Sequence, residues 1–245
     1  MKVTYITEAV GTYFLVLTVG LTVLAGTPLA PIAIGSSLMV MVYMGGHISG
    51  AHYNPAVTLA VWMRGKLPTR DVIPYWLAQL VGGVLAALTV WVLTGKTFAP
   101  APGPGVGAGR ALLVEGLFTF ALALVVLNSA TSRQTEGNSF YGLAIGFTVL
   151  VGAFAGGAIS GGAFNPAVGI APALVDAAFG GSALGHAWLY LVGPLAGGAV
   201  AALLFRAQNP EEPEQAIPAA PAQETLAPGG TYTPSLPGER PSRTT

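Results

Sequence analysis

The chain has 245 residues, of which 53% are hydrophobic and only 8% are charged, and its mean hydropathy is +0.65. A soluble domain carries about a quarter charged residues, so this composition excludes an ordinary water-soluble globular protein. The formal net charge of zero gives no electrostatic basis for a nucleic-acid partner, and the absence of cysteine excludes disulfides and thiolate metal sites.

Six long apolar runs follow one another along the chain, at residues 6–25, 31–46, 72–94, 111–130, 139–158 and 184–205. Most of them approach the ~20 residues that a helix needs to cross a lipid bilayer. The first run carries Glu8 and lacks a basic leader with a small-residue cleavage site, so we predict a retained span rather than a signal peptide. The second run is short and must recruit flanking residues to cross.

Two shorter apolar segments, residues 54–64 and 165–175, interrupt this series. About 10 helical residues cover ~15 Å, which is roughly half of the hydrocarbon core. Each segment begins with Asn-Pro-Ala, and asparagine is a favoured N-cap while proline suits the first helical position. The sequence therefore predicts two half-spanning helices that start inside the membrane. Their first residues are Asn54, Pro55 and Ala56, and Asn165, Pro166 and Ala167.

The two triplets belong to an internal repeat. The stretch GHISGAHYNPAV at residues 46–57 returns as GAISGGAFNPAV at residues 157–168, and Asn54 and Asn165 stand 111 residues apart. Further matches pair Glu8 and Thr12 with Glu115 and Thr119, and Ala33-Ile34-Gly35 with Ala144-Ile145-Gly146. Each half, about residues 5–95 and 110–206, holds three spans. Because three is odd, the halves insert with opposite orientation, and a pathway is expected at their interface.

Basic residues are distributed unevenly between the connecting segments. If the N-terminus is cytoplasmic, six Lys or Arg residues lie in inner segments and two, Lys96 and Arg110, lie in outer ones. Inner segments are usually enriched in basic residues, so we predict cytoplasmic termini and an external loop at residues 97–109. The membrane domain covers residues 1–207. Residues 208–245 are rich in Pro, Ala, Glu and Thr, and we predict that they form a disordered cytoplasmic tail.

Two half-helices whose N-termini face each other would form an unusual site at the membrane midplane. Each N-terminus carries about half a positive charge, so the pair repels cations, while the amides of Asn54 and Asn165 offer N–H donors to a passing solute. A single Asn-Pro pair could simply cap a helix. Two copies with matched flanks favour a pore instead.

These motifs resemble those of the aquaporin, or major intrinsic protein, family. The resemblance covers about residues 5–206 and rests on SGAHYNPAVTLA, the two Glu-x-x-x-Thr starts, Tyr75-Trp76-Leu77-Ala78-Gln79, and Trp188 followed by Gly193-Pro194. It implies an all-α membrane protein with an aquaporin-like inverted repeat of six transmembrane helices and two re-entrant half-helices. It also implies a homotetramer with one pore per subunit, in which Asn54 and Asn165 donate hydrogen bonds to water or small neutral molecules moving passively.

The chain departs from the family pattern after the second triplet. Most members continue with an arginine, which lines a narrow outer filter with three other positions; here the four positions fall on Ile34, Ala153, Gly162 and Val168. Water-selective members have an aromatic residue and a histidine at the first two positions, and this chain has neither. The small residues Ala153 and Gly162 leave the filter opening wide, while Ile34 and Val168 make its wall apolar. We therefore predict a wide, apolar filter without arginine.

Two other outcomes stay open for this filter. Another side chain could fill the gap, and the candidates are Tyr43, Arg110 and Phe154. Alternatively, an apolar ring could dewet and conduct poorly.

Glu8 and Glu115 are carboxylates inside predicted spans, where ionisable residues are costly and usually functional. Each half of the repeat has one such glutamate at an equivalent position, next to the segment where the helix is interrupted. Because the two do not form a chain of acids, we favour bracing of the re-entrant loops over proton transfer. We expect His52 to support the first loop and His47 to lie near the inner mouth. Neither has partners at metal-ligand spacing, so no metal site is predicted. Tyr190 is expected at the membrane interface.

The predicted function is a passive channel in a prokaryotic inner membrane for small uncharged solutes, such as glycerol, urea and arsenite-type metalloid hydroxides, and for water. The alternative within this class is a water-selective channel whose filter another side chain closes. A secondary transporter also uses inverted repeats with broken helices, but it needs a coupling-ion site. A membrane enzyme is disfavoured because the sequence shows no nucleophile–base pair and no metal-ligand set, and no cofactor is expected.

Overall fold

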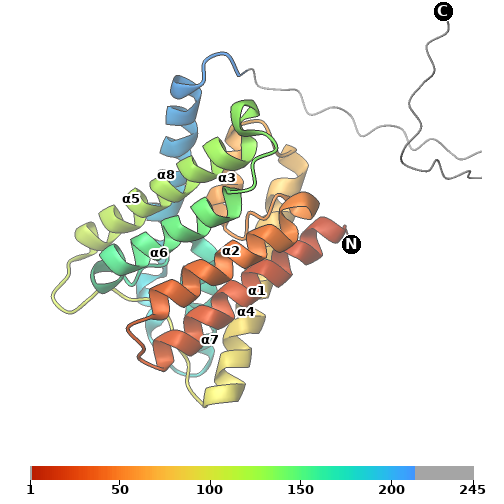
Figure 1. Ribbon diagram of the computed structural model, residues 1–245. Coiled ribbons are helices and arrows are strands. Elements are labelled where there is room, and N and C mark those ends of the chain that lie inside the picture. The colour runs from red at the N-terminus through yellow and green to blue at the C-terminus, as the bar shows by residue number, and fades with distance from the viewer. Residues whose placement is uncertain (1, 213–245) are drawn as a thin grey trace, which may run out of the picture.

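The computed structural model of the protein describes residues 2–212, which form a bundle of helices (Figure 1). The α-helices are α1 (Val3–Leu24), α2 (Ala30–Ser49), α3 (Pro55–Met63), α4 (Thr69–Thr94), α5 (Ala108–Val126), α6 (Tyr141–Ser160), α7 (Pro166–Ala178) and α8 (Ala187–Gln208). A π-helical turn (Leu127–Thr131) prolongs α5, and 3₁₀ turns occupy Arg133–Thr135 and Ala183–His186. The part of the predicted tail at residues 213–245 lies outside the described residues.

Within residues 2–212, six helical segments are long and apolar enough to cross a membrane. They correspond to the six predicted spans, while α3 and α7 are the two predicted half-spans. The second span reaches a crossing length because α2 continues through the glycines to Ser49. The prediction of an all-α fold with six spans and two half-helices is therefore confirmed.

The two halves interlock through their half-helices. Helix α3 of the first half packs against α8 of the second, and α7 of the second half packs against α4 of the first. Within the halves, α1 packs on α4 and α5 packs on α8, while α2 and α6 cross between the halves. Each half-helix is thereby surrounded by protein, which is the condition under which interrupted backbone survives at membrane depth.

Glycines allow the helices to approach closely at equivalent places in the two halves. A Cβ atom at Gly82 in α4 would overlap the carbonyl oxygen of Ala9 in α1, and one at Gly197 in α8 would overlap that of Gly116 in α5. Small residues at such crossings are how membrane helices gain van der Waals contact. At the crossing of α2 and α6, a Cβ atom at Gly35 would lie only 2.6 Å from the Cβ atom of its neighbour on α6.

Candidate functional site

Asn54 and Asn165 cap the two half-helices in the same way. Both have extended backbone, with φ of −155° and −161°, and each side-chain Oδ1 accepts a hydrogen bond of 2.9 Å from the backbone N–H two residues later. Helices α3 and α7 then begin at Pro55 and Pro166. The helix starts predicted from the triplets are therefore confirmed.

The same two side chains also join the two halves. Asn54 Nδ2 donates to the carbonyl oxygen of Phe164 at 2.9 Å, and Asn165 Nδ2 donates to that of Tyr53 at 2.8 Å. Each acceptor is the residue directly before the opposite triplet. Because a primary amide carries two N–H donors, each asparagine retains a second donor after this bond is made. The cross-bonds thus fix the orientation of both amides and leave one N–H donor on each for a further acceptor.

The backbone before each triplet turns sharply. Tyr53 has φ of 48° and Phe164 has φ of 49°, and Ala51 also lies in the left-handed region with φ of 50°. Non-glycine residues there cost roughly 1–3 kcal/mol each and persist only where surrounding contacts hold them. The re-entrant loops therefore need an external support.

Glu8 supplies that support in the first half. Its two carboxylate oxygens accept hydrogen bonds from Ser49 Oγ at 2.7 Å, His52 N at 2.9 Å, Tyr53 N at 2.7 Å and Gln79 Nε2 at 2.8 Å. The side chain is fully buried. Hydrogen bonds to a charged group are each worth about 1.5–3 kcal/mol, so this carboxylate can hold the strained turn in place.

Glu115 occupies the equivalent position in the second half. It accepts hydrogen bonds from Ser160 Oγ at 2.7 Å, Ala163 N at 3.1 Å and Phe164 N at 2.6 Å. The geometry repeats that of Glu8 without a partner equivalent to Gln79. This arrangement supports the bracing role predicted for both glutamates.

Two tyrosines that sequence reasoning did not assign to the loops also secure them. Tyr75 OH donates to the carbonyl oxygen of Ser49 at 2.8 Å, and Tyr190 OH donates to that of Ser160 at 2.6 Å. Tyr190 is 1% exposed, so the prediction that it lies at the membrane interface is wrong. The signal that could have found this pair is the repeat itself, since the two tyrosines occupy equivalent positions once four extra residues in the second half are allowed for.

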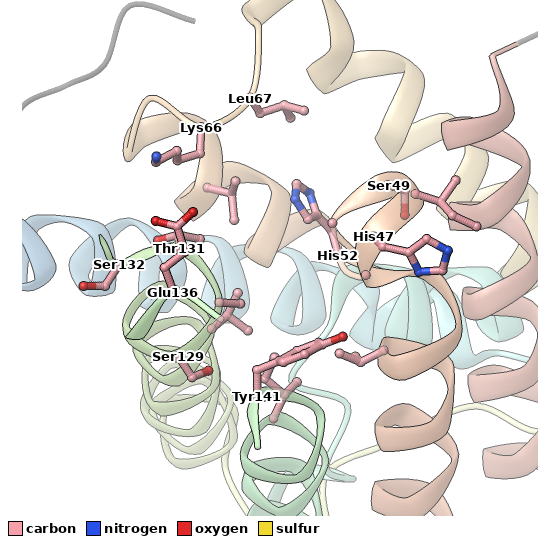
Figure 2. A pocket seen from close by; sticks show the side chains of 18 of the residues that line it. His47, Ser49, His52, Lys66, Leu67, Ser129, Thr131, Ser132, Glu136 and Tyr141 are labelled. Atoms are coloured by element: carbon pink, nitrogen blue, oxygen red, sulfur yellow. The ribbon is translucent and has the colours of Figure 1, made fainter. Parts of the chain in front are cut away.

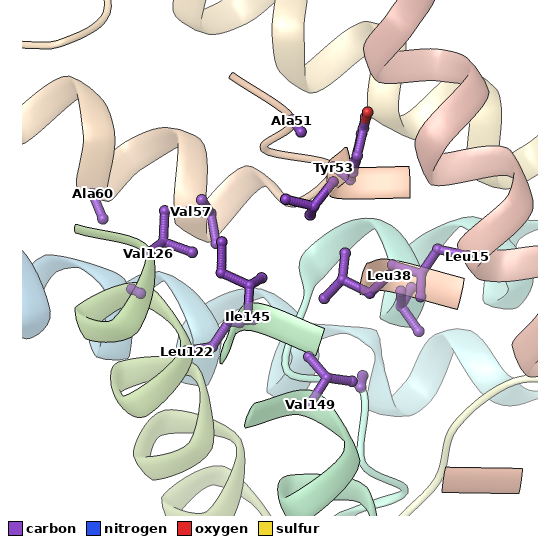
Figure 3. Close-up of a cluster of buried hydrophobic side chains, with 14 of the residues drawn as sticks. Leu15, Leu38, Ala51, Tyr53, Val57, Ala60, Leu122, Val126, Ile145 and Val149 are labelled. Carbon is purple, nitrogen blue, oxygen red and sulfur yellow. The ribbon is translucent and has the colours of Figure 1, made fainter. Parts of the chain in front are cut away.

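A narrow cavity of about 20 Å³ lies between the asparagines. This volume accommodates about one water molecule. Among the four predicted filter residues, the cavity wall includes Ile34, Gly162 and Val168, but not Ala153, which is half-buried on α6. The remaining wall is largely aliphatic and includes Leu15, Leu38, Val57 and Val149 (Figure 3).

None of the three side chains considered as replacements for the filter arginine lines this cavity. Tyr43 donates from its OH to the Ser139 carbonyl oxygen at 3.2 Å, near the start of α6. Phe154 is 52% exposed on the outside of the bundle. Arg110 is exposed and donates to the Gly105 carbonyl oxygen, in the loop predicted to be external, at 2.7 Å.

A larger cavity of about 890 Å³ opens at the end of the bundle that the sequence predicts to be cytoplasmic, and we call it the inner vestibule (Figure 2). Both His47 and His52 line it, and the His52 Nδ1 atom lies 3.1 Å from Thr58 Oγ1 on α3. Charged residues of both signs also line it, including Lys2 and Glu136. Within residues 2–212, no group of three or more His, Asp or Glu side chains is placed to hold a metal ion.

Glu212 ties the chain after α8 to the rim of the inner vestibule. Its carboxylate accepts from Ser132 Oγ and, at 2.9 Å, from Arg133 N, and it pairs with Arg64 at the end of α3. Desolvation alone would raise the pKa of Glu212, but the hydrogen bonds from Ser132 and Arg133 and the charge of Arg64 hold this pKa below its usual range. Asn209 and Glu212 thus make hydrogen bonds to Asn128 and Ser132 where the sequence predicted the start of a disordered tail.

Comparisons with known proteins agree with this architecture. A family model described as major intrinsic protein matches residues 1–205. Aquaporin NIP1-4 of Oryza sativa subsp. japonica is 37% identical over 180 residues, which is 73% of this chain and 64% of that relative, so the match spans slightly less than two thirds of the relative. Glycerol uptake facilitator protein-like 6 of Lactiplantibacillus plantarum is 36% identical over 221 residues, covering 85% of this chain and 99% of the relative.

A solved structure shares the fold. The X-ray structure of the aquaglyceroporin from Plasmodium falciparum superposes with a TM-score of 0.74 at 22% identity, covering 82% of this chain and 93% of that chain. The paired half-helices, the inverted repeat and the family match all lead to the same conclusion. The chain belongs to the major intrinsic protein family, a family of membrane channels rather than enzymes.

Proposed function

We propose that this protein is a passive, bidirectional channel for small uncharged solutes such as glycerol, urea and arsenite-type metalloid hydroxides, and for water. The observation that carries the proposal is the position of Val168. This residue lines the cavity beside the asparagine pair, where the family resemblance places an arginine, and it is 4% exposed. A valine removes both the charge and the hydrogen-bond donors that an arginine would supply.

The asparagine pair supports uncharged solutes over cations. Each half-helix N-terminus contributes about half a positive charge, and Asn54 and Asn165 each keep one N–H donor. A hydroxyl or carbonyl oxygen can accept from these donors. A cation would meet positive potential in a cavity whose other walls are mostly aliphatic.

Within this proposal the channel lies in a prokaryotic inner membrane with both termini cytoplasmic, as a homotetramer. The excess of basic residues in the predicted inner segments supports this orientation. Support for the tetramer comes from the family resemblance.

A water-selective channel is the second candidate, and the narrow cavity favours it. A volume of about 20 Å³ holds about one water molecule, so a larger solute must displace aliphatic side chains to pass. A secondary transporter has less support. The carboxylates of Glu8 and Glu115 are occupied by hydrogen bonds from the re-entrant loops, which leaves them poorly suited to bind a coupling ion.

Stopped-flow light scattering on proteoliposomes tests the proposal, with water, glycerol, urea and arsenite as solutes. We expect the native protein to pass the larger solutes and Val168→Arg to lower their flux roughly tenfold while water flux persists. Val168→Leu is the matched control, because it adds bulk without charge. A native channel that passes only water, or a Val168→Arg variant with unchanged fluxes, would overturn the assignment of Val168.

A further inference from the structure

The inverted repeat gives each residue of the predicted outer filter a counterpart on the inner side of the asparagine pair. Counterparts stand 111 residues apart, as the asparagines do. They are Ile145 for Ile34, Val42 for Ala153, Ala51 for Gly162 and Val57 for Val168. We call Val42, Ala51, Val57 and Ile145 the inner ring.

The inner ring lies at the neck between the two cavities. Ala51 and Val57 line the narrow central cavity, Val42 lines the inner vestibule, and Ile145 lines both. All four side chains are buried, with exposed fractions between 2% and 6%. The ring is therefore the place where a vestibule of about 890 Å³ narrows to a cavity of about 20 Å³. Figure 3 shows Val57 and Ile145 projecting toward each other from α3 and α6.

The inner ring is built from larger residues than the outer filter. At two of the four positions the residue is the same on both sides, isoleucine at one and valine at the other. At the other two the inner ring has the larger residue, with Val42 in place of Ala153 and Ala51 in place of Gly162. The backbone supports the comparison at the second pair, because Ala51 and Gly162 are both left-handed, with φ of 50° and 67°. With matching backbone, the added methyl groups narrow the inner side.

His52 narrows the same neck further. It lines both cavities, and its counterpart in the second half is the much smaller Ala163. The His52 ring is held beside Thr58 Oγ1 at 3.1 Å and packs against Tyr75 with ring centroids 5.0 Å apart. A ring fixed on two sides cannot readily swing out of the way of a passing solute.

We infer that the inner ring, rather than the outer filter, sets the upper size limit of the solutes that this channel passes. The inference rests on the proposed function, in which uncharged solutes pass between Asn54 and Asn165. Because the side chains of the ring are aliphatic, the ring selects by cross-section and not by charge or hydrogen bonding. With valine at position 168 the outer filter lacks the long side chain of an arginine, whereas the inner ring keeps its larger aliphatic side chains.

The repeat itself supplies a matched pair of variants for the test. Val42→Ala gives the inner ring the side chain of the outer filter, and Ala153→Val makes the reverse change outside. The measurement is the ratio of glycerol to water permeability in proteoliposomes. We expect Val42→Ala to raise this ratio about threefold or more and Ala153→Val to change it less than about twofold. An unchanged ratio in Val42→Ala, or a fall of about threefold in Ala153→Val, would overturn the inference.

Ala51→Gly provides a second variant in case Val42→Ala fails to fold. Glycine adopts the left-handed backbone of this position without strain, so folding should be retained, and the ratio should again rise. The outcomes also separate the two proposals. If native protein passes only water but the inner-ring variants gain glycerol flux, the inner ring is limiting and the proposed solute range is wrong. If native protein passes glycerol and neither variant changes the ratio, the inference about the ring fails alone.

Discussion

Replacing Glu8 with alanine measures how far the first re-entrant loop depends on one buried carboxylate. The substitution removes the acceptor for the backbone N–H groups of His52 and Tyr53. Of the other two donors, Gln79 Nε2 also donates to Thr58 Oγ1 at 2.9 Å, whereas the Ser49 hydroxyl loses its acceptor and keeps only the bond that it accepts from Ala51 N. Two buried N–H groups left unpaired cost about 1–3 kcal/mol each, so we expect the free energy of unfolding to fall by roughly 2–6 kcal/mol.

The equivalent change in the second half should cost a similar amount. Glu115→Ala leaves the backbone N–H groups of Ala163 and Phe164 without their acceptor, again two buried donors. Similar losses of unfolding free energy in the two variants would show that Glu8 and Glu115 stabilise their re-entrant loops to the same extent.

Equilibrium unfolding in mixed detergent micelles, followed by circular dichroism, is the assay. Thr12→Val is the control on the same helix, because Thr12 is buried and its Oγ1 has no hydrogen-bond partner within residues 2–212. Valine keeps the shape, so the control should change stability by less than about 1 kcal/mol. A loss below about 1 kcal/mol for Glu8→Ala, or an equal loss for Thr12→Val, would refute the bracing argument.

Three further predictions address the helix crossing, the pore centre and the vestibule rim. In Gly82→Ala the new Cβ atom would overlap the Ala9 carbonyl oxygen, so we expect the variant to lose its monodisperse peak in size-exclusion chromatography. The control Gly109→Ala, whose Cβ atom meets nothing within 4 Å, should keep that peak. Asn54→Asp replaces amide donors by a negative charge at the half-helix N-termini, so glycerol flux should fall and cation conductance in planar bilayers should rise. The pKa of the Glu212 carboxylate is lowered in the folded protein, so its contacts contribute full stability above its unfolded pKa of about 4.3. We expect residues 127–140 to be protected from hydrogen exchange above that pH, and this protection to be lost as the pH falls through the folded pKa. Equal protection in Glu212→Gln would contradict this last prediction.

Much of the architecture follows from the sequence because the physical signals are local. Apolar length predicts a span, and an Asn-Pro pair predicts a helix start wherever the helix lies in the membrane. The internal repeat then relates the two halves, and the shared Glu-x-x-x-Thr pattern at the start of a span pairs Glu8 with Glu115.

The tertiary structure decided which side chains meet across the two halves. The bond from Asn54 to the Phe164 carbonyl oxygen joins loops 110 residues apart, and no local pattern specifies it. Tyr190 turns inward to Ser160, and Ala153 lies outside the central cavity wall, because the rotation of each helix is set by packing against its neighbours rather than by hydropathy. In an apolar chain the hydropathy of the two faces of a helix is similar, so the sequence does not show which face lines the pore. The close helix crossings of the bundle determine it.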